Sequence, residues 1–288
     1  MYSYSKKQEK FETYVLEHRE SESYIEVVTE RGCIISKYVY QGEQIFYLDQ
    51  ATLEDESKNI RGGNPILFPI SSYLEDETYT YEGKAYQLKQ HGFARQLPGR
   101  VIAVHADDRE ASITLEIVDD EATRERYPFH FRLVMTYTLN KDGLTIEASV
   151  TNKDSKVMPY YLGYHPYFYV EDKVALELTI PSSSYNEMLP GSMVNGQFNF
   201  EQNESNVIYD QLEEGSCSMI DRARSLKVTL EYDEVYQYIV LWALQDKPFI
   251  CIEPWMAPVN GMNVGKGVQQ LAPNGNAQST IRVRPQRV

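Results

Sequence analysis

Residues 131–150 read FRLVMTYTLNKDGLTIEASV, and this stretch decides the fold class. Apolar side chains occupy every second position on both sides of an Asp142-Gly143 pair: Phe131, Leu133, Met135, Tyr137 and Leu139, then Leu144, Ile146, Ala148 and Val150. Because successive side chains of a β-strand point to opposite faces, each run has one apolar face and one mostly polar face. Asp-Gly between two such runs is a strong signal for a tight turn. The stretch therefore predicts a hairpin in an antiparallel sheet that has one face exposed to solvent.

The same alternation recurs along the rest of the chain. Short strands are predicted at ESYIEVV (22–28), CIISKYVY (33–40), QIFYL (44–48), ASITLEIV (111–118), VALELTI (174–180), LKVTLEY (226–232), YIVLWAL (238–244) and STIRVRP (279–285). Helical signals are few: residues 52–57 and 122–127 each predict one short helix, and Pro128 ends the second. Strands and helices do not alternate, which disfavours a doubly wound sheet or a (β/α)8 barrel.

The predicted fold is all-β, a large antiparallel β-sandwich with few short helices. Hydrophobic residues make up 42% of the 288 residues and are spread along the whole length, which is enough for a substantial core. We expect residues 1–288 to form a single domain, with residues 1–20 as a less ordered N-terminal extension.

The charge balance narrows the class of partner. Lys and Arg total 28 against 42 Asp and Glu, which gives a net charge of −14. Such a chain repels nucleic acid and anionic membrane surfaces, and no basic run is visible in the sequence. The expected partner is a small molecule, bound by a monomer or a homodimer, with no nucleic acid and no membrane involved.

The cysteines and the N-terminus indicate a cytoplasmic protein. Cys33, Cys217 and Cys251 are far apart and form no CxxC motif, which fits a reducing compartment. The first residues, MYSYSKKQEKFE, lack the apolar stretch of a signal peptide, and no apolar run approaches 18 residues. No GxSxG elbow, P-loop or HExxH motif occurs, so neither a cofactor nor a metal is expected.

Three stretches break the strand pattern by combining Gly, Pro and aromatic residues with ionisable groups. They are RGGNPILFPI (61–70) together with QHGFARQLPG (90–99), then YYLGYHPYF (160–168), and PFICIEPWMAPVNGMN (248–263). Glu253 follows an apolar run, so its carboxylate is expected to be desolvated, which raises its pKa and suits a base. Each ionisable residue also has a structural interpretation: Glu253 as a strand end, His165 as a packed core residue, His91 as a turn residue and Arg61 as a loop charge.

GGNPILFP, HGFAR, GYHPYF and CIEPW occur in an order and at a spacing that resemble the aldose 1-epimerase family, from about residue 20 to the C-terminus. The resemblance implies the galactose-mutarotase-like supersandwich fold and mutarotase activity. It also implies roles: Glu253 takes the proton of the sugar C1 hydroxyl, and His165 protonates the ring oxygen. His91 holds and polarises the sugar, and Arg61 binds substrate.

The chemistry of the reaction fits these residue types. A cyclic aldose is a hemiacetal, whose C1–O5 bond breaks when O1 loses a proton and O5 gains one. A buried glutamate and a histidine, which start near pKa 4.3 and 6.5, can exchange these roles without metal, nucleotide or covalent intermediate. Aromatic rings pack against the C–H face of a sugar, so Tyr167, Trp255 and Phe93 are candidate walls of the site.

The substrate and one binding residue stay open. RGG followed by HGFAR resembles the hexose-6-phosphate mutarotase branch, where arginines matching Arg61 and Arg95 contact the phosphate. CIEPW with PVNGMN is closer to another bacterial branch, so both a free and a phosphorylated aldose remain candidates. The substrate-binding aspartate of the family has two candidate positions here, Asn206 and Asp210.

Two other classes of function remain as alternatives. A carbohydrate-binding β-sandwich without catalysis would bind sugars and leave anomer exchange at the uncatalysed rate. A metal-dependent lyase or isomerase on a similar sandwich would lose activity in chelator.

Overall fold

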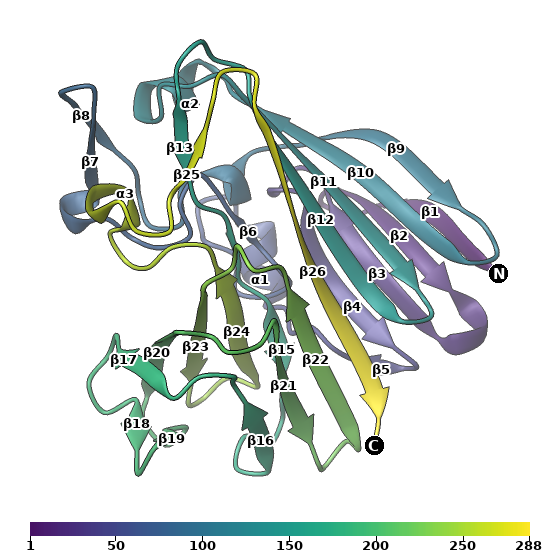
Figure 1. The fold of residues 1–288 in the computed structure, drawn as a ribbon. Coiled ribbons are helices and arrows are strands. Elements are labelled where there is room, and N and C mark those ends of the chain that lie inside the picture. Colours follow the sequence, from purple (N-terminus) through teal and green to yellow (C-terminus); the bar gives the residue numbers. More distant parts are fainter.

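The computed structural model describes residues 1–288, and its sheets are antiparallel, as predicted (Figure 1). The largest sheet has eight strands in the order β16 (Leu176–Thr179), β21 (Ser216–Asp221), β22 (Leu226–Tyr232), β26 (Asn276–Arg287), β12 (Gly143–Asn152), β11 (Phe131–Asn140), β10 (Glu110–Val118) and β9 (Arg100–Ala106). The predicted all-β fold is confirmed.

A seven-stranded sheet carries the segments that break the strand pattern. Its order is β17 (Ser184–Glu187), β20 (Glu204–Asp210), β23 (Tyr238–Leu244), β24 (Phe249–Trp255), β14 (Gly163–Tyr164) and β6 (Ile66–Leu67), and β15 (Tyr167–Tyr169) also pairs with β24. The short β14 and β15 flank a break in the strand, and both pair with the long β24. This break is where His165 lies.

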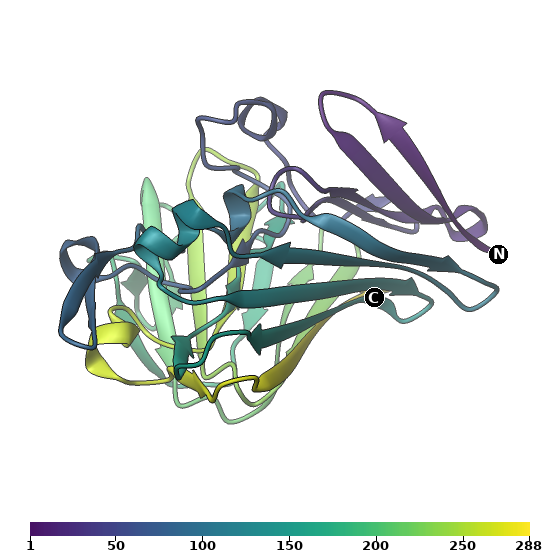
Figure 2. The same ribbon diagram turned by 90° about the horizontal axis from the view of Figure 1, so that it is seen from above.

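The N-terminal sheet runs in chain order through β1 (Tyr2–Gln8), β2 (Glu12–His18), β3 (Ser23–Val28), β4 (Ile34–Tyr40) and β5 (Glu43–Gln44), and Figure 2 shows β1 and β2 projecting beside the long strands. Residues 1–20, expected to be a less ordered extension, are instead mostly strand. The physical reason is burial, because Tyr2, Tyr14 and Leu16 join the main hydrophobic core. The strand pattern of ETYVLEH is short and was not recognised in the sequence.

Three small two-stranded sheets and six short helical segments complete the fold. The small strand pairs are β7 (Thr78–Tyr81) with β8 (Lys84–Gln87), β13 (Met158–Tyr160) with β25 (Gln269–Leu271), and β18 (Met193–Val194) with β19 (Gln197–Phe198). The helices are α1 (Gln50–Glu54), α2 (Glu121–Arg126) and α3 (Gly261–Val264), with 3-10 turns at η1 (Arg19–Ser21), η2 (Glu75–Glu77) and η3 (Ala94–Gln96). Helix α2 confirms the prediction at 122–127, whereas α1 begins two residues before the stretch predicted at 52–57 and ends at Glu54.

The decisive hairpin forms as predicted, with its turn one residue earlier. Asn140 pairs with Gly143, so Lys141 and Asp142 make the turn. Gly143 has a φ of +120°, and a Cβ there would lie 2.4 Å from the carbonyl oxygen of Val283. The glycine is therefore needed for the backbone conformation and for the close approach of β26, rather than for the centre of the turn.

The main core lies between the large sheets and has 59 buried members. From the seven-stranded sheet, alternate residues such as Ile239 and Leu241 on β23 and Ile250 and Ile252 on β24 enter this core. The intervening residues of the same strands must face the other way, because the side-chain period of a strand is two. The second face of this sheet is therefore free to build a site.

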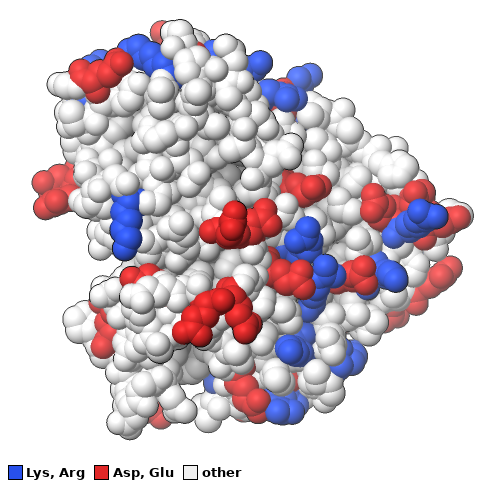
Figure 3. All heavy atoms as spheres, viewed as in Figure 1, with Lys and Arg blue, Asp and Glu red and all other residues white.

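Acidic and basic side chains are interspersed on the face shown in Figure 3, and the basic ones form no continuous patch there. No helix in the structure combines the length and apolar character that crossing a membrane would require.

Candidate active site

The register of β23 and β24 places Glu253 on the second face of the seven-stranded sheet. Trp242 pairs with Cys251, Val240 with Glu253, and Tyr238 with Trp255. Directly paired residues of antiparallel strands project to the same side, so these six side chains share one surface, called here the site face. Glu253 is 1% exposed on this face, which confirms the expected desolvation of its carboxylate.

His165 reaches the same face from the break between β14 and β15. Gly163 pairs with Trp255 and Tyr167 pairs with Cys251, so the residues between them span the position opposite Glu253. The backbone N–H of His165 donates to the Pro65 carbonyl at 3.1 Å, which fixes the break. The His165 Nε2 then lies 3.4 Å from Oε1 of Glu253.

The rings around His165 hold its orientation. The imidazole stacks on Tyr167 with centroids 4.7 Å apart and planes 9° apart. Trp242 meets it edge to face at 5.7 Å. The His165 Nδ1 atom is buried and has no hydrogen-bond partner. The side chain is thus positioned by packing on two sides, and its Nε2 faces the glutamate.

His91 lies beside this pair because of a strained turn. Its φ is +67° and that of Gly92 is +65°. A Cβ on residue 92 would lie 2.3 Å from the Phe68 carbonyl oxygen, so only glycine permits this approach. The His91 ring centroid is 5.6 Å from that of His165 and 5.8 Å from that of Trp255.

The hydrogen bonds of His91 define its tautomer. Its Nδ1 lies 2.7 Å from the Ser71 carbonyl oxygen, which can only accept, so Nδ1 carries the proton. The Nε2 is then an acceptor and lies 3.3 Å from the Gln90 side-chain nitrogen. Burial, followed by the charge of Arg95, lowers the pKa of His91 to about 3. His91 is therefore a neutral acceptor at neutral pH.

Burial moves the pKa values of the His165–Glu253 pair in opposite directions. It raises the pKa of Glu253 well above its usual value, opposed by the hydrogen bond from Trp255 Nε1 at 3.2 Å and by the charge of Arg95. Burial lowers the pKa of His165 well below its usual value, and His91, Arg95 and Arg61 act in the same direction. The uncharged forms of both side chains are favoured in this dry environment.

Arg61 and Arg95 converge on the site without carboxylate partners. The Arg61 guanidinium lies 5.1 Å from the ring centroid of Trp242. Arg95 donates from Nη2 to the Gln90 carbonyl at 3.2 Å, and its buried Nε has no partner. Neither side chain forms a salt bridge, although the protein carries a net charge of −14. Two unpaired guanidinium groups therefore adjoin the histidines.

Two of the three aromatic residues predicted to be walls of the site lie beside its histidines. Tyr167 stacks on the ring of His165, and Trp255 lies edge to face with the ring of His91. Phe93 does not, because it packs in the main core against Phe68 and Phe131. Trp242 was missed by the sequence reasoning, which treated YIVLWAL as an ordinary strand. The register with β24 reveals its position, and the sequence carries no signal for that register.

The two candidates for the family aspartate lie at different ends of the site face. Asn206 on β20 pairs with Trp242, and its Oδ1 is buried without a partner. Asp210 accepts a hydrogen bond from Ser184 Oγ at 2.5 Å and lines a separate cavity of about 520 Å³. Asn206 is thus the candidate that lies directly beside Trp242, and its side-chain oxygen Oδ1 has no hydrogen-bond partner.

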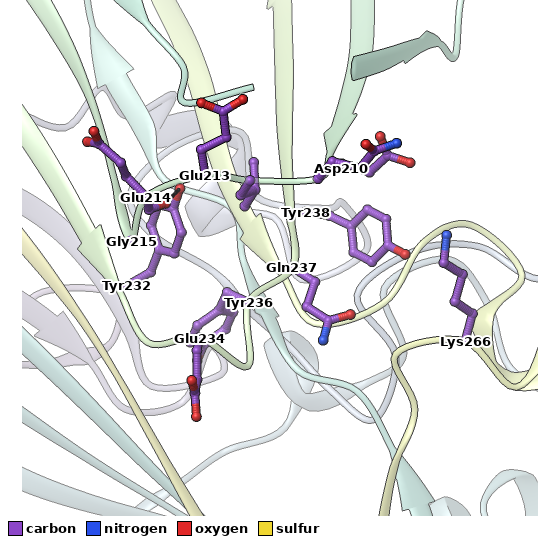
Figure 4. Close-up of a pocket in the computed structure, with 12 residues that line it drawn as sticks. Asp210, Glu213, Glu214, Gly215, Tyr232, Glu234, Tyr236, Gln237, Tyr238 and Lys266 are labelled. Atoms are coloured by element: carbon purple, nitrogen blue, oxygen red, sulfur yellow. Dashed lines mark hydrogen bonds between the residues drawn. The ribbon is translucent and has the colours of Figure 1, made fainter. Parts of the chain in front are cut away.

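The cavity of Asp210 lies outside the cluster of predicted site residues. Its lining includes Glu213, Glu214, Tyr238 and Lys266, and Figure 4 shows the Tyr238 hydroxyl directed toward Lys266. None of His91, His165 and Glu253 lines it. Of the six residues that define the site face, only Tyr238, which pairs with Trp255, lines this cavity.

One group of side chains in the site has the composition of a metal site. His165, Cys251 and Glu253 are all buried, and their ligand atoms lie within 4.8 Å of one another. The sequence did not indicate this cluster, because 86 residues separate the histidine from the cysteine and no metal-binding motif joins them.

Comparison with known proteins identifies what the chain resembles. The sequence model of the family described as "Aldose 1-epimerase" matches residues 14–284. The Slr1438 protein from Synechocystis sp. PCC 6803 is 34% identical, with a TM-score of 0.93 over 100% of both chains. A galactose mutarotase-like protein from Clostridium acetobutylicum is 17% identical, with a TM-score of 0.84 over 100% of this chain and 99% of the other. This likeness confirms the predicted galactose-mutarotase-like fold.

A curated relative from Salmonella typhimurium, named "Putative glucose-6-phosphate 1-epimerase", is 28% identical over 142 residues. The match covers 45% of this chain and 45% of the relative.

Proposed function

The chain belongs to the aldose 1-epimerase family, and we propose that it interconverts the α and β anomers of an aldose by acid–base opening of the sugar ring. Membership of the family supports an isomerase activity. The observation that carries the proposal is the buried contact of 3.4 Å between Glu253 Oε1 and His165 Nε2. An acid and a base on one face, close enough to reach O1 and O5 of the same ring, are what the reaction requires.

In the proposed mechanism, the Glu253 carboxylate takes the proton of the C1 hydroxyl while the His165 imidazolium gives a proton to O5. The C1–O5 bond breaks, and the electron pair of the O1–H bond forms the aldehyde. Rotation about C1–C2 presents the other face of the carbonyl to the O5 hydroxyl. When the ring closes, protonated Glu253 gives its proton to O1, and the O5 hydroxyl gives its proton back to His165. Acid and base have then exchanged roles. No cofactor takes part in these steps.

Surrounding groups would hold the sugar for this exchange. The lone pair of His91 Nε2 can accept a hydrogen bond from a sugar hydroxyl in place of the one from the Gln90 amide. Tyr167, Trp242 and Trp255 offer flat apolar surfaces for the C–H face of the ring. Trp255 also donates to Glu253 Oε2, which leaves Oε1 directed at His165 and at the reacting oxygens.

The function is tested by measuring anomer exchange by NMR for glucose, galactose and glucose 6-phosphate at several enzyme concentrations. We expect the exchange rate to rise in proportion to enzyme for at least one of these sugars. Rates equal to buffer with all of them would contradict the proposal. Saturable sugar binding with no acceleration would instead identify a carbohydrate-binding protein without catalysis.

The unpaired arginines favour a phosphorylated aldose as the substrate. A guanidinium with a buried N–H that lacks a partner is costly, and a phosphate at the rim of the site would satisfy it with a charge-assisted hydrogen bond. Arg95 Nε is buried without a partner, and Arg61 is exposed near Trp242. The relative whose name refers to glucose 6-phosphate supports the same class of substrate.

Arg61→Ala is expected to lower kcat/KM for glucose 6-phosphate by about 10- to 100-fold while that for glucose changes little, because one charged hydrogen bond contributes about 1.5–3 kcal/mol. The measurement is the ratio of kcat/KM for the two sugars. Arg109→Ala is the matched control, since it removes the same charge from an exposed residue in the turn between β9 and β10. Equal losses for both sugars in Arg61→Ala would argue for a free aldose.

A further inference from the structure

Cys251 is a buried ionisable side chain next to Glu253 on the site face, and the proposed mechanism leaves it without a task. It is a free, fully buried cysteine on β24, two residues before Glu253 and on the same face. Its sulfur, a ring nitrogen of His165 and a carboxylate oxygen of Glu253 lie within 4.8 Å of one another. A thiol, an imidazole and a carboxylate thus meet at one point inside the protein.

We propose that His165, Cys251 and Glu253 form a binding site for Zn²⁺, and that the bound ion reversibly inhibits the enzyme. Sulfur, nitrogen and oxygen together are the ligand set that zinc takes in proteins, whereas Mg²⁺ and Ca²⁺ prefer oxygen alone. With ligand bonds of about 2.0–2.1 Å to nitrogen and oxygen, two ligands of a tetrahedral ion lie ~3.3 Å apart. The distance of 3.4 Å between His165 Nε2 and Glu253 Oε1 already matches this edge.

The charges around the cluster permit the ion. Burial and the charge of Glu253 raise the pKa of the Cys251 thiol, and the positive charges of Arg61 and Lys173 act in the opposite direction. The charge of Arg95 likewise favours the carboxylate of Glu253 against the effect of its burial. These cations repel Zn²⁺, but they also stabilise the thiolate and the carboxylate that bind it. A thiolate and a carboxylate together neutralise the two charges of the ion, so the complex is uncharged within a buried site. The thiol proton leaves to solvent when the sulfur binds.

The site has three protein ligands, which leaves one tetrahedral position open. A histidine that binds a metal through one ring nitrogen usually donates a hydrogen bond from the other, but His165 Nδ1 has no acceptor here. A missing second partner on a metal-bound histidine typically costs about 10- to 100-fold in affinity. We therefore expect reversible binding that a chelator removes, rather than the permanent binding of a structural zinc.

Inhibition follows from the identity of the ligands, and this step rests on the proposed function. Zn²⁺ occupies the Glu253 oxygen and the His165 lone pair that would exchange protons with the sugar. The enzyme with zinc bound therefore has neither its base nor its acid. Zinc should compete with the sugar, and chelator should restore full activity to the inhibited enzyme.

The first experiment is independent of activity. Chelator-treated protein is titrated with Co²⁺ and followed by its visible and near-ultraviolet absorption, and with Zn²⁺ by calorimetry. We expect one ion per chain, tetrahedral cobalt bands and a thiolate-to-cobalt charge-transfer band. Cys251→Ser and Cys251→Val should lose that band, whereas Cys217→Ala, which changes a buried cysteine on β21, should keep it. Absence of the band in the wild-type protein would overturn the zinc site, whatever the activity.

The second experiment measures anomer exchange against free Zn²⁺ concentration. Cys251→Ser and Cys251→Val are expected to turn over sugar without zinc and to need at least about tenfold more Zn²⁺ for half inhibition, as loss of one metal ligand would cause. Equal zinc sensitivity in these variants and the wild type, or activation by zinc, would overturn the inhibitory role. A protein that gives the cobalt band but exchanges no anomers would instead retain the metal site and refute the proposed function.

Discussion

Glu253→Gln is expected to lower kcat for anomer exchange by about 10²- to 10⁴-fold, the usual contribution of a positioned general base. Glutamine cannot take the proton of the C1 hydroxyl. It has nearly the same shape, and its Oε1 can still accept the hydrogen bond from Trp255 Nε1. Since burial already favours the neutral form of residue 253, the neutral amide should fold with little change in stability. The measurements are NMR exchange rates and a thermal unfolding midpoint.

The matched control is Glu214→Gln, which removes a carboxylate from the cavity of Figure 4. That variant should retain wild-type kcat, because its side chain does not reach the His165–Glu253 pair. The reverse pattern, with activity lost in Glu214→Gln and kept in Glu253→Gln, would move the active site to the cavity of Figure 4. A fully active Glu253→Gln alone would refute the assignment of the base.

The hairpin at 131–150 and most other strands could be predicted, because alternation is a local property of the sequence and each strand buries one face. Strands β1 and β2 were missed because their pattern is short and their burial depends on contacts with the main core. The turn at Gly143 was displaced by one residue because the approach of β26 determines where glycine is required. Tertiary contacts decided both cases.

The candidate site depended on a different kind of information. His165 and Glu253 are 88 residues apart, and only the pairing of β14 and β15 with β24 brings them to 3.4 Å. The motifs pointed to these residues through the family resemblance. Trp242 belongs to none of those motifs, and Cys251, although it is the first residue of CIEPW, was given no role. The position of Trp242 becomes visible only once the register of β23 and β24 is known. Sequence patterns reveal which face a residue shares within its strand, but not which strand lies beside it.

The protonation of the pair links this geometry to the pH dependence of the reaction. Glu253 with a raised pKa and His165 with a lowered pKa hold one proton between them over the interval separating the two values. The catalytic form, carboxylate with imidazolium, contains the same single proton transferred across the contact of 3.4 Å. The pair titrates as a unit, so the two limbs of the pH profile belong to both residues.

The sign of each limb follows from the directions of the shifts. As pH falls, activity is lost when the pair takes a second proton, and the lowered pKa of His165 places this limb below 6.5. As pH rises, activity is lost when the pair releases its one proton, at a pH raised by the burial of Glu253. We therefore expect kcat/KM to stay level as pH decreases through 6.5, where an ordinary histidine would titrate.

His165→Asn is expected to lower kcat by about 10²- to 10⁴-fold and to remove the alkaline limb of the profile, because the remaining carboxylate acts only as a base. His105→Asn, an exposed histidine on β9, is the control and should keep the wild-type profile. Since acid and base act in one step, the double variant with Glu253→Gln should be little slower than the slower single variant. A double variant whose loss equals the product of the two single losses would mean that His165 and Glu253 act independently, and that the contact between them is not the catalytic unit.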